Sequence, residues 1–412
     1  ENGELEYYNT TEYFRVRHTS DRMYLLNYER KMNQIFRGEN ANFYANCIQL
    51  GIRDGDIQYV SNETGNIVCF VQEGELWSYN AQEERLSQVF SFRGYEGIDD
   101  RENNGNHEIR IVKVNESGSA DFVVYGYMNR GNHEGEVGIC VYHYDSVANT
   151  VEEELFLPFS RSYEIMKAQL GQMMYESEAN KFYLVLGSSL YEIDMSTMDY
   201  KEIQSGLEEG AYAVSESHRY VAYLEGENKD RSSSIRVLDL EMGENFQINA
   251  KSGEYVRTLG FMEDDFIYGI ARAADVEEDA AGNTVFPMYS VRIVDTAGED
   301  HGILKEYKKE GYYVSDIEVA DYTIYLERIQ HNGVAYVGVN QDTIMNREAD
   351  TESLVEVDTT VMKEKQTRHQ LVLKSQEEIE ARKLLTPKQI VLTTPKSIAL
   401  NVENTGEYYY AY

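Results

Sequence analysis

A strand pattern that ends on Asp or Asn recurs along the chain and limits the folds that the chain can adopt. Each copy is an apolar run, then the acidic or amide residue, then a few polar residues before the next strand. Asp and Asn side chains hydrogen-bond backbone groups two residues onward, so they suit the first position of a tight turn. The stops are Asn27, Asn80, Asp145, Asp194, Asp239, Asp295 and Asn340, which lie 53, 65, 49, 45, 56 and 45 residues apart.

Other strand-like runs surround most of these stops. "NIVCFV" and "DFVVYGYM" come directly before two of the stop-bearing strands, and "HEIRIVKV" lies one strand earlier. Each repeat therefore holds four short antiparallel strands, and this pattern resembles the blade of a β-propeller. The resemblance implies an all-β fold, with one β-propeller domain over residues 1–412 and seven four-stranded blades. Eight blades is the alternative count.

The two ends of the chain are predicted to complete one blade and so close the ring. The first copy has "YFRVRHT" and "MYLLN" but no innermost strand, and the C-terminal "SIALNVENTGEYYYAY" offers the missing strands. Such closure removes open sheet edges. Residues 346–397 do not follow the repeat, and a capping box at Ser375–Glu378 predicts a short helix there. We expect residues 346–397 to form a helix-containing insertion or irregular segment packed on the ring.

The charge balance restricts the partners. Acidic residues outnumber basic ones 72 to 38, which gives a net charge of −34. A field of this sign repels phosphate backbones and anionic lipids, so we expect no nucleic-acid partner. No apolar run approaches the ~18 residues of a membrane helix. Because the sequence begins at Glu1 without an initiator Met, we expect an extracellular or cell-surface protein whose signal or anchor was removed before Glu1.

The segment "DRENNGNHE", residues 100–108, resembles the D-x-D-x-D-G-x-x-D type of calcium loop. Alternate residues of such a loop direct oxygen atoms at one hard cation, and Gly105 permits the sharp turn. The ligands that this resemblance implies for Ca²⁺ are Asp100, Glu102, Asn104, the carbonyl of Asn106, and Glu108. Glu replaces Asp at the third and ninth positions, and the alternative is a polar surface loop without a cation.

Two further observations concern the face of the predicted ring on which the loop at residues 100–108 opens. "GNHE" occurs twice, which places His107 and His133 on neighbouring loops of one blade, where they could share a transition metal or remain a metal-free surface pair. Long loops on this face carry Arg and Tyr, the residue types that dominate binding hot spots. The predicted ligand-binding residues are Arg93, Tyr95, Arg101, Arg161, Tyr163, His107 and His133.

Catalytic signatures such as G-x-S-x-G, H-E-x-x-H or a Gly-rich phosphate loop do not occur in the sequence. The three cysteines have no C-x-x-C spacing, and a disulfide through Cys47 stays open. We therefore expect a non-catalytic extracellular module of a bacterial surface or secreted protein, which binds a protein, peptide or glycan. The alternatives are a carbohydrate-active hydrolase or lyase with carboxylates in a central pocket, and a sensor or assembly domain. The partner of such a domain would be another part of the same, longer protein, and an exposed apolar patch would support it.

Overall fold

The structure is a computed structural model, and the part of the chain that it describes is all-β apart from one short helix, α1 (Tyr163–Gln169). The described residues are 7–39, 42–53, 55–93, 101, 104–226, 228–279, 281–320, 322–345, 353–361, 367–390 and 396–402. The chain divides into two compact units. Unit 1 comprises residues 1–167 and 352–400, and unit 2 comprises residues 168–351 and 401–412.

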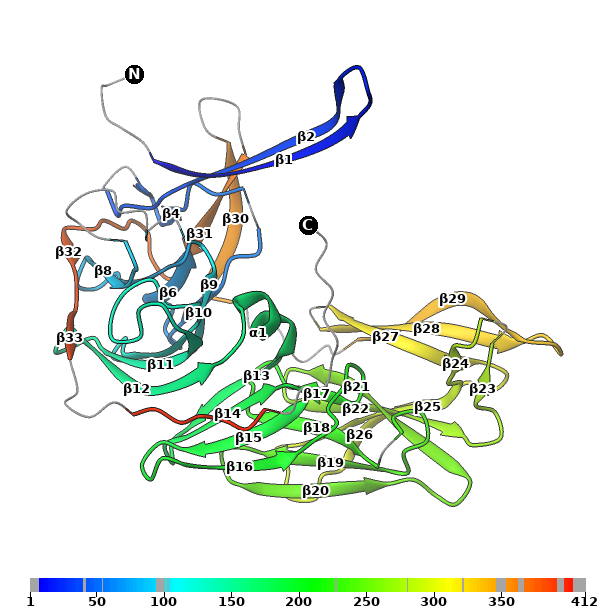
Figure 1. Cartoon of the computed structure of the whole chain (residues 1–412). Helices are drawn as coiled ribbons and strands as arrows, with labels where there is room; N and C mark the ends of the chain where they lie inside the picture. The colour runs from blue at the N-terminus through cyan, green and yellow to red at the C-terminus, as the bar shows by residue number, and fades with distance from the viewer. Residues whose placement is uncertain are drawn as a thin grey trace. The chain divides into compact units, whose positions relative to one another are not determined.

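Unit 1 contains two four-stranded antiparallel meanders of the kind that the repeat predicts (Figure 1). The strands of the first are β5 (Tyr59–Ser61), β6 (Ile67–Gln72), β7 (Glu75–Asn80) and β8 (Arg85–Phe90). The strands of the second are β9 (His107–Val114), β10 (Ala120–Tyr127), β11 (Val137–Asp145) and β12 (Thr150–Phe159). Each meander gains one short parallel edge strand from late in the chain, β32 (Lys383–Leu385) beside β8 and β33 (Lys388–Ile390) beside β12.

Early and late parts of the chain combine in a third sheet of unit 1. Its strands, in spatial order, are β3 (Phe43–Tyr44), β4 (Cys47–Gln49), β31 (Thr367–Leu373) and β30 (Val355–Val361). β31 runs antiparallel to β4, so that Leu371 lies opposite Ile48. The described parts of residues 346–397, which the sequence predicts to be an insertion or irregular segment, thus supply strands to three sheets of this unit.

The helix predicted from Ser375 is wrong, because tertiary contacts hold this segment extended. The Ser375 hydroxyl donates to the Gly65 carbonyl, and the Ile379 amide donates to the Ala45 carbonyl. The Ile379 side chain is buried in the core that contains Trp77. Local capping preference therefore gives way to tertiary hydrogen bonds and burial.

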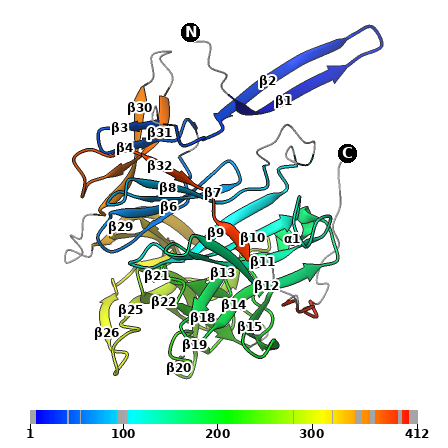
Figure 2. The same cartoon turned by 90° about the vertical axis from the view of Figure 1, so that its left-hand side faces the viewer.

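The prediction that strands from the two ends of the chain complete one blade names the wrong strands. β1 (Tyr8–His18) and β2 (Met23–Gln34) form a two-stranded sheet with each other (Figure 2). Ser397 makes a single parallel bridge to Phe156, and residues 403–412 lie outside the described part of the chain. Early and late segments do meet in one sheet, but they are β3–β4 and β30–β31.

Unit 2 continues the repeat with two more meanders. They consist of β13 (Leu170–Ser177), β14 (Lys181–Leu186), β15 (Ser189–Asp194) and β16 (Asp199–Gln204), and of β17 (Tyr212–Val214), β18 (Tyr220–Glu225), β19 (Ser234–Asp239) and β20 (Glu244–Asn249). A larger sheet follows, with β21 (Glu254–Met262), β22 (Asp265–Arg272), β25 (Met288–Val294), β26 (Ile303–Tyr307), β27 (Tyr313–Ala320), β28 (Thr323–His331) and β29 (Tyr336–Met345). β23 (Glu277–Glu278) and β24 (Thr284–Val285) form a small ribbon.

The larger sheet of unit 2 is two blade-like groups joined at one point. β25 pairs with β27 only through Met288 and Val314, whereas β21, β22, β25 and β26 form a continuous ladder. β27, β28 and β29 form the other group. The described residues therefore contain seven blade-like groups of strands, three in unit 1 and four in unit 2.

The proposed role of the Asp and Asn stops is confirmed at five positions. The side-chain oxygens of Asp145, Asp194 and Asp239 each accept two backbone N–H hydrogen bonds from the turn that follows. Asn80 and Asp295 each accept one. The prediction is wrong for Asn27 and Asn340, which lie inside β2 and β29, because the strand ladder continues past both residues.

The hydrophobic core lies between neighbouring sheets of the same unit. In unit 1, Phe90 from the first meander packs against Phe122 and Tyr142 of the second. Cys69 and Cys140 are fully buried in this layer, and all three cysteines are free thiols, so the disulfide considered for Cys47 is not formed. Cys140, in this layer, is also part of the side-chain cluster of the candidate functional site.

Candidate functional site

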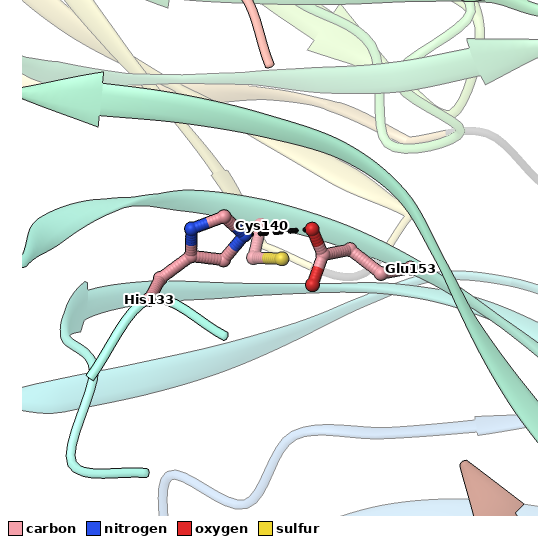
Figure 3. Close-up of side chains that lie close together, drawn as sticks. All are labelled: His133, Cys140 and Glu153. Atoms are coloured by element: carbon pink, nitrogen blue, oxygen red, sulfur yellow. Dashed lines mark hydrogen bonds and ion pairs between the residues drawn. The ribbon is translucent and has the colours of Figure 1, made fainter. Parts of the chain in front are cut away.

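Three chemically reactive side chains meet over the middle of the β11–β12 pair, in the second meander of unit 1. His133 lies in the loop between β10 and β11, Cys140 lies in β11, and Glu153 lies in β12. The His133 Nε2 atom is 2.7 Å from a Glu153 carboxylate oxygen. One ligand atom of each side chain lies within 4.8 Å of the other two, and Figure 3 shows the thiol and the carboxylate on the same side of the imidazole ring.

The local sequence explains why His133 turns inward. Residues 131, 132 and 134 to 136 are exposed, whereas His133 is buried. Gly131 and Gly135 have φ values of 95° and 90°, a left-handed backbone that L side chains rarely adopt, so they allow the loop to reverse. The imidazole stacks on Phe156 with a centroid separation of 3.6 Å. The ring orientation is thereby fixed.

A β-bulge sets the position of Glu153. Val141 lies opposite Leu155, but Tyr142 lies opposite Glu153, so Glu154 is the extra residue of β12. Bulges redirect side chains and are frequent beside functional sites. Here the bulge places Glu153 next to Tyr142 and within reach of His133.

The electrostatic environment keeps the thiol protonated. Burial, reinforced by the Glu153 carboxylate, raises the pKa of Cys140 well above its ordinary value, although a hydrogen bond with Tyr142 acts the other way. Burial likewise raises the pKa of Tyr142. A nucleophilic cysteine needs a depressed pKa and access to solvent. The fully buried Cys140 therefore does not fit a cysteine nucleophile, despite the adjacent His and Glu.

Two of the three predicted arginine residues of the ligand face have intramolecular partners. Arg93 donates to the Glu73 carbonyl at 2.8 Å and forms an ion pair with Glu75 at 3.2 Å. Arg101 forms an ion pair with Glu134 at 3.0 Å. Arg161 is half-buried just before α1, and Tyr95 lies outside the described residues.

Tyr163, a predicted ligand-binding residue, contacts Glu108, a predicted calcium ligand. The Glu108 carboxylate accepts hydrogen bonds from Tyr125 at 2.5 Å, Tyr163 at 2.8 Å and Lys167. Burial alone would raise the pKa of Glu108, but these donors outweigh it and hold the pKa below its usual value. The carboxylate thereby ties the start of β9 to α1.

Of the other predicted calcium ligands, two lie among the described residues. The Asn104 Oδ1 atom accepts the Asn106 amide at 3.0 Å, and the Asn106 carbonyl accepts the Tyr127 amide at 2.7 Å. Asp100 and Glu102 lie outside the described residues. Calcium binding by this loop stays a prediction.

The two histidines of the repeated "GNHE" have different surroundings. His107 packs edge-on against Phe92 and has its Nε2 atom 3.2 Å from the Gly74 carbonyl. Burial lowers the pKa of His107. Within the described residues, the one metal-sized group of His, Cys, Asp and Glu side chains contains His133 with Cys140 and Glu153, and not His107.

The hairpin β1–β2 is a second candidate site, which sequence reasoning missed. Its base is fixed to unit 1, because Asn9 and Asn33 both donate to the Glu73 carboxylate at 2.6 Å. Among the described residues, the hydrogen bonds, ion pairs and ring contacts of residues 12–30 all lie within the hairpin. Figures 1 and 2 show it extending away from the other strands of unit 1.

The two faces of this hairpin differ in chemistry. Directly opposed residues of an antiparallel pair share a face, and alternate residues along a strand do too. One face carries large apolar side chains, which are 43 to 63% exposed: Phe14, Val16, Met23, Leu25 and Tyr28. The Glu12–Arg30 ion pair and His18 border them on the same face. The opposite face carries Arg15, Arg17, Tyr13 and Tyr24. This alternation was visible in the sequence, but it was assigned to a blade.

Comparisons with known proteins give matches among solved structures. No family model and no curated protein matches it. Among solved structures it is similar to the tricorn protease, with 14% identity over 74% of this chain and 30% of that one and a TM-score of 0.34. For the Porphyromonas gingivalis dipeptidyl peptidase 4 the identity is 10%, over 75% and 56% of the two chains, and the TM-score is 0.30.

A third solved structure is the β-propeller domain of the Trilobed protease from Pyrococcus furiosus, with 11% identity over 56% of this chain and 69% of that one and a TM-score of 0.27. This chain thus spans less than two thirds of the first two proteins. All three TM-scores are below 0.5, so these likenesses carry no functional conclusion. In the described part of the chain, no helix has the length and apolar character to cross a bilayer.

Proposed function

We propose that the chain is a non-catalytic protein-binding module, and that hairpin β1–β2 is the element with which it holds its partner. The observation that supports this function is the apolar face formed by Phe14, Val16, Met23, Leu25 and Tyr28, all exposed on a two-stranded ribbon. An isolated hairpin is marginally stable in water. Contiguous exposed apolar side chains, bordered by polar ones, are typical of a protein-interaction surface.

Charge points to a second copy of the chain as the partner. Residues 8–34 carry five basic and three acidic side chains, a net charge of +2, so the rest of the chain carries −36. A basic, apolar ribbon is attracted to a strongly acidic protein surface. A second copy supplies such a surface, and each copy can offer its hairpin to the other in a symmetric dimer. The assembly alternative raised by the sequence also expects an exposed apolar patch, but its partner is another part of the same, longer protein and not a second copy.

The finer architecture is part of the same proposal. We infer that the seven blade-like groups stack around one axis as a single β-propeller, in a secreted or surface protein of a bacterium. The four-strand repeat and the packing of adjacent sheets within each unit support the propeller, and the acidic composition supports an exported protein. Small-angle scattering of the monomer tests the ring, which predicts a radius of gyration of about 22 Å for a compact chain of this length. A much larger radius would refute it.

Sedimentation velocity of the full chain over a range of concentrations tests the dimer. We expect a monomer–dimer equilibrium that shifts toward monomer as salt is added, because the attraction is partly electrostatic. The variant Phe14→Ser/Leu25→Ser changes two exposed residues of the apolar face and should be monomeric. Tyr13→Ser/Tyr24→Ser, on the opposite face, is the matched control and should still dimerise.

Two results would overturn this assignment. One is a wild-type chain that stays monomeric at every concentration. The other is a dimer that the Phe14→Ser/Leu25→Ser variant retains in full, since the apolar face would then have no part in assembly. Retention of the near-ultraviolet circular dichroism of the wild type shows that each variant is folded, so loss of the dimer reports on the surface itself.

A further inference from the structure

We propose that His133, Cys140 and Glu153 form a zinc site over the middle of the β11–β12 pair in unit 1. The proposal is independent of the hairpin and goes beyond the protein-binding function. It rests on one nitrogen, one sulfur and one oxygen ligand whose donor atoms lie within 4.8 Å of one another (Figure 3). These are the three ligand types that zinc accepts in proteins.

The distances need only small adjustments. Zinc bonds of about 2.0 to 2.3 Å place tetrahedral ligand atoms about 3.3 to 3.6 Å apart. The His133 Nε2 and Glu153 oxygen atoms are 2.7 Å apart and would separate by less than about 1 Å to admit an ion. The other separations, at most 4.8 Å, would close by about as much. Three protein ligands leave the fourth position for a water molecule, the coordination number typical of an open zinc site.

The charge and the softness of the three ligands favour zinc. On binding, the ion displaces the proton of the Cys140 thiol to solvent. The resulting thiolate and the Glu153 carboxylate together neutralise a dication, and His133 binds as the neutral imidazole, so the buried complex carries no net charge. A thiolate is a soft ligand that favours zinc over the hard ions calcium and magnesium. Cys140 therefore separates this site from the oxygen-only calcium loop predicted at residues 100–108.

The surroundings of the cluster match those of a metal site. Metal-binding histidines commonly direct their second ring nitrogen at a carboxylate. Here the Nδ1 atom of His133 faces the Glu136 carboxylate at 3.9 Å, and Phe156 stacks on the ring and fixes its orientation. Cys140 and Glu153 are held by paired strands, so two ligands sit on rigid elements. The loop residues on either side of His133 are exposed, so this ligand lies close to the surface.

Cobalt titration of the full, chelator-stripped chain tests the site, because a cobalt–thiolate bond produces a charge-transfer band in the near ultraviolet. We expect the band to saturate at one cobalt per chain and to disappear when zinc is added. Cys140→Ser should abolish the band. Glu153→Gln keeps the side-chain shape, so it tests the site even if Cys140→Ser fails to fold. This variant should weaken cobalt binding at least tenfold.

Cys69→Ser is the matched control, since Cys69 is equally buried in the same core layer but lies outside the cluster. The control should keep both the band and the affinity. Absence of the band in the wild type would overturn the proposal. So would a band that survives in Cys140→Ser, or binding that Glu153→Gln leaves unchanged.

Discussion

The buried pair of Glu75 and Arg93 gives a sharp prediction about stability in unit 1. Glu75 begins β7 and is 2% exposed. One carboxylate oxygen accepts hydrogen bonds from Ser91 at 2.5 Å and Gln88 at 3.1 Å, and the other lies 3.2 Å from Arg93. Burial raises the pKa of Glu75, while the charge of Arg93 opposes that rise.

Replacing Arg93 by Ala leaves this carboxylate buried without a cation. Removing one partner of a buried pair costs about 3 to 5 kcal/mol. The Ser91 and Gln88 donors remain, and the Arg93 side chain is 22% exposed, so we expect the lower end, about 3 kcal/mol, near neutral pH.

The sign of the pH dependence follows from the pKa of Glu75. Because the folded-state pKa lies above the unfolded value of 4.5, the contribution of Glu75 to stability is fully present below that value and is lost as the pH rises through the folded pKa. Arg93→Ala raises the folded pKa further. The destabilisation caused by the variant should therefore be larger at alkaline than at acidic pH.

Urea unfolding of wild type, Arg93→Ala, Glu75→Gln and the double variant, at about pH 5 and about pH 8, measures both effects. Glu75→Gln in the Arg93→Ala background removes the stranded charge and should restore at least half of the lost stability at the higher pH. The reasoning would be refuted by a loss in Arg93→Ala that is equal at the two pH values and that Glu75→Gln does not reduce.

Three further predictions concern other acidic groups. Burial, together with Asp295 and other nearby acids, raises the pKa of Asp265 to about 6, so its stabilising contribution is present below 3.8 and lost as the pH rises through about 6. Asp265→Asn should therefore raise the unfolding free energy by about 1 kcal/mol above pH 6 and not at pH 3, a value reduced for solvent screening and measured by urea unfolding. Calorimetric titration with calcium should show binding that Asp100→Ala abolishes, and no heat at millimolar calcium would reject the loop. Glu108→Gln should weaken the attachment of α1, seen as faster amide hydrogen exchange in residues 163–169, and unchanged exchange would contradict this role.

The local features of the fold could be predicted from the sequence because they depend on near neighbours. Asp145, Asp194 and Asp239 accept hydrogen bonds from the amides of residues two and three positions ahead. These turns therefore depend on the local sequence alone. The same holds for the strands before these turns. By contrast, nothing in residues 43–49 specifies that residues 367–373 will be their partner, since both segments are simply short apolar strands.

The candidate sites depended on details that no local pattern records. The alternation in residues 13–28 predicts strands correctly, but it does not reveal that these two strands pair only with each other in the described part of the chain. Glu153 reaches His133 only because a bulge removes Glu154 from the ladder. The repeated "GNHE" indicates His133 as a possible metal ligand. It does not indicate Cys140 and Glu153, which the fold places beside His133.

The sheet of β3, β4, β31 and β30 has a consequence for how the protein is made. Asn46 and Leu373, joined there by a hydrogen bond, are 327 residues apart in sequence. At about 5 to 20 residues per second, a ribosome needs roughly 15 to 65 s to synthesise the chain between them. During that time β4 emerges early with no β31 to pair with, and its edge is open to other chains. A chaperone that binds nascent strands would be most needed in this interval, and a truncated chain that lacks β31 would keep the vulnerable edge permanently.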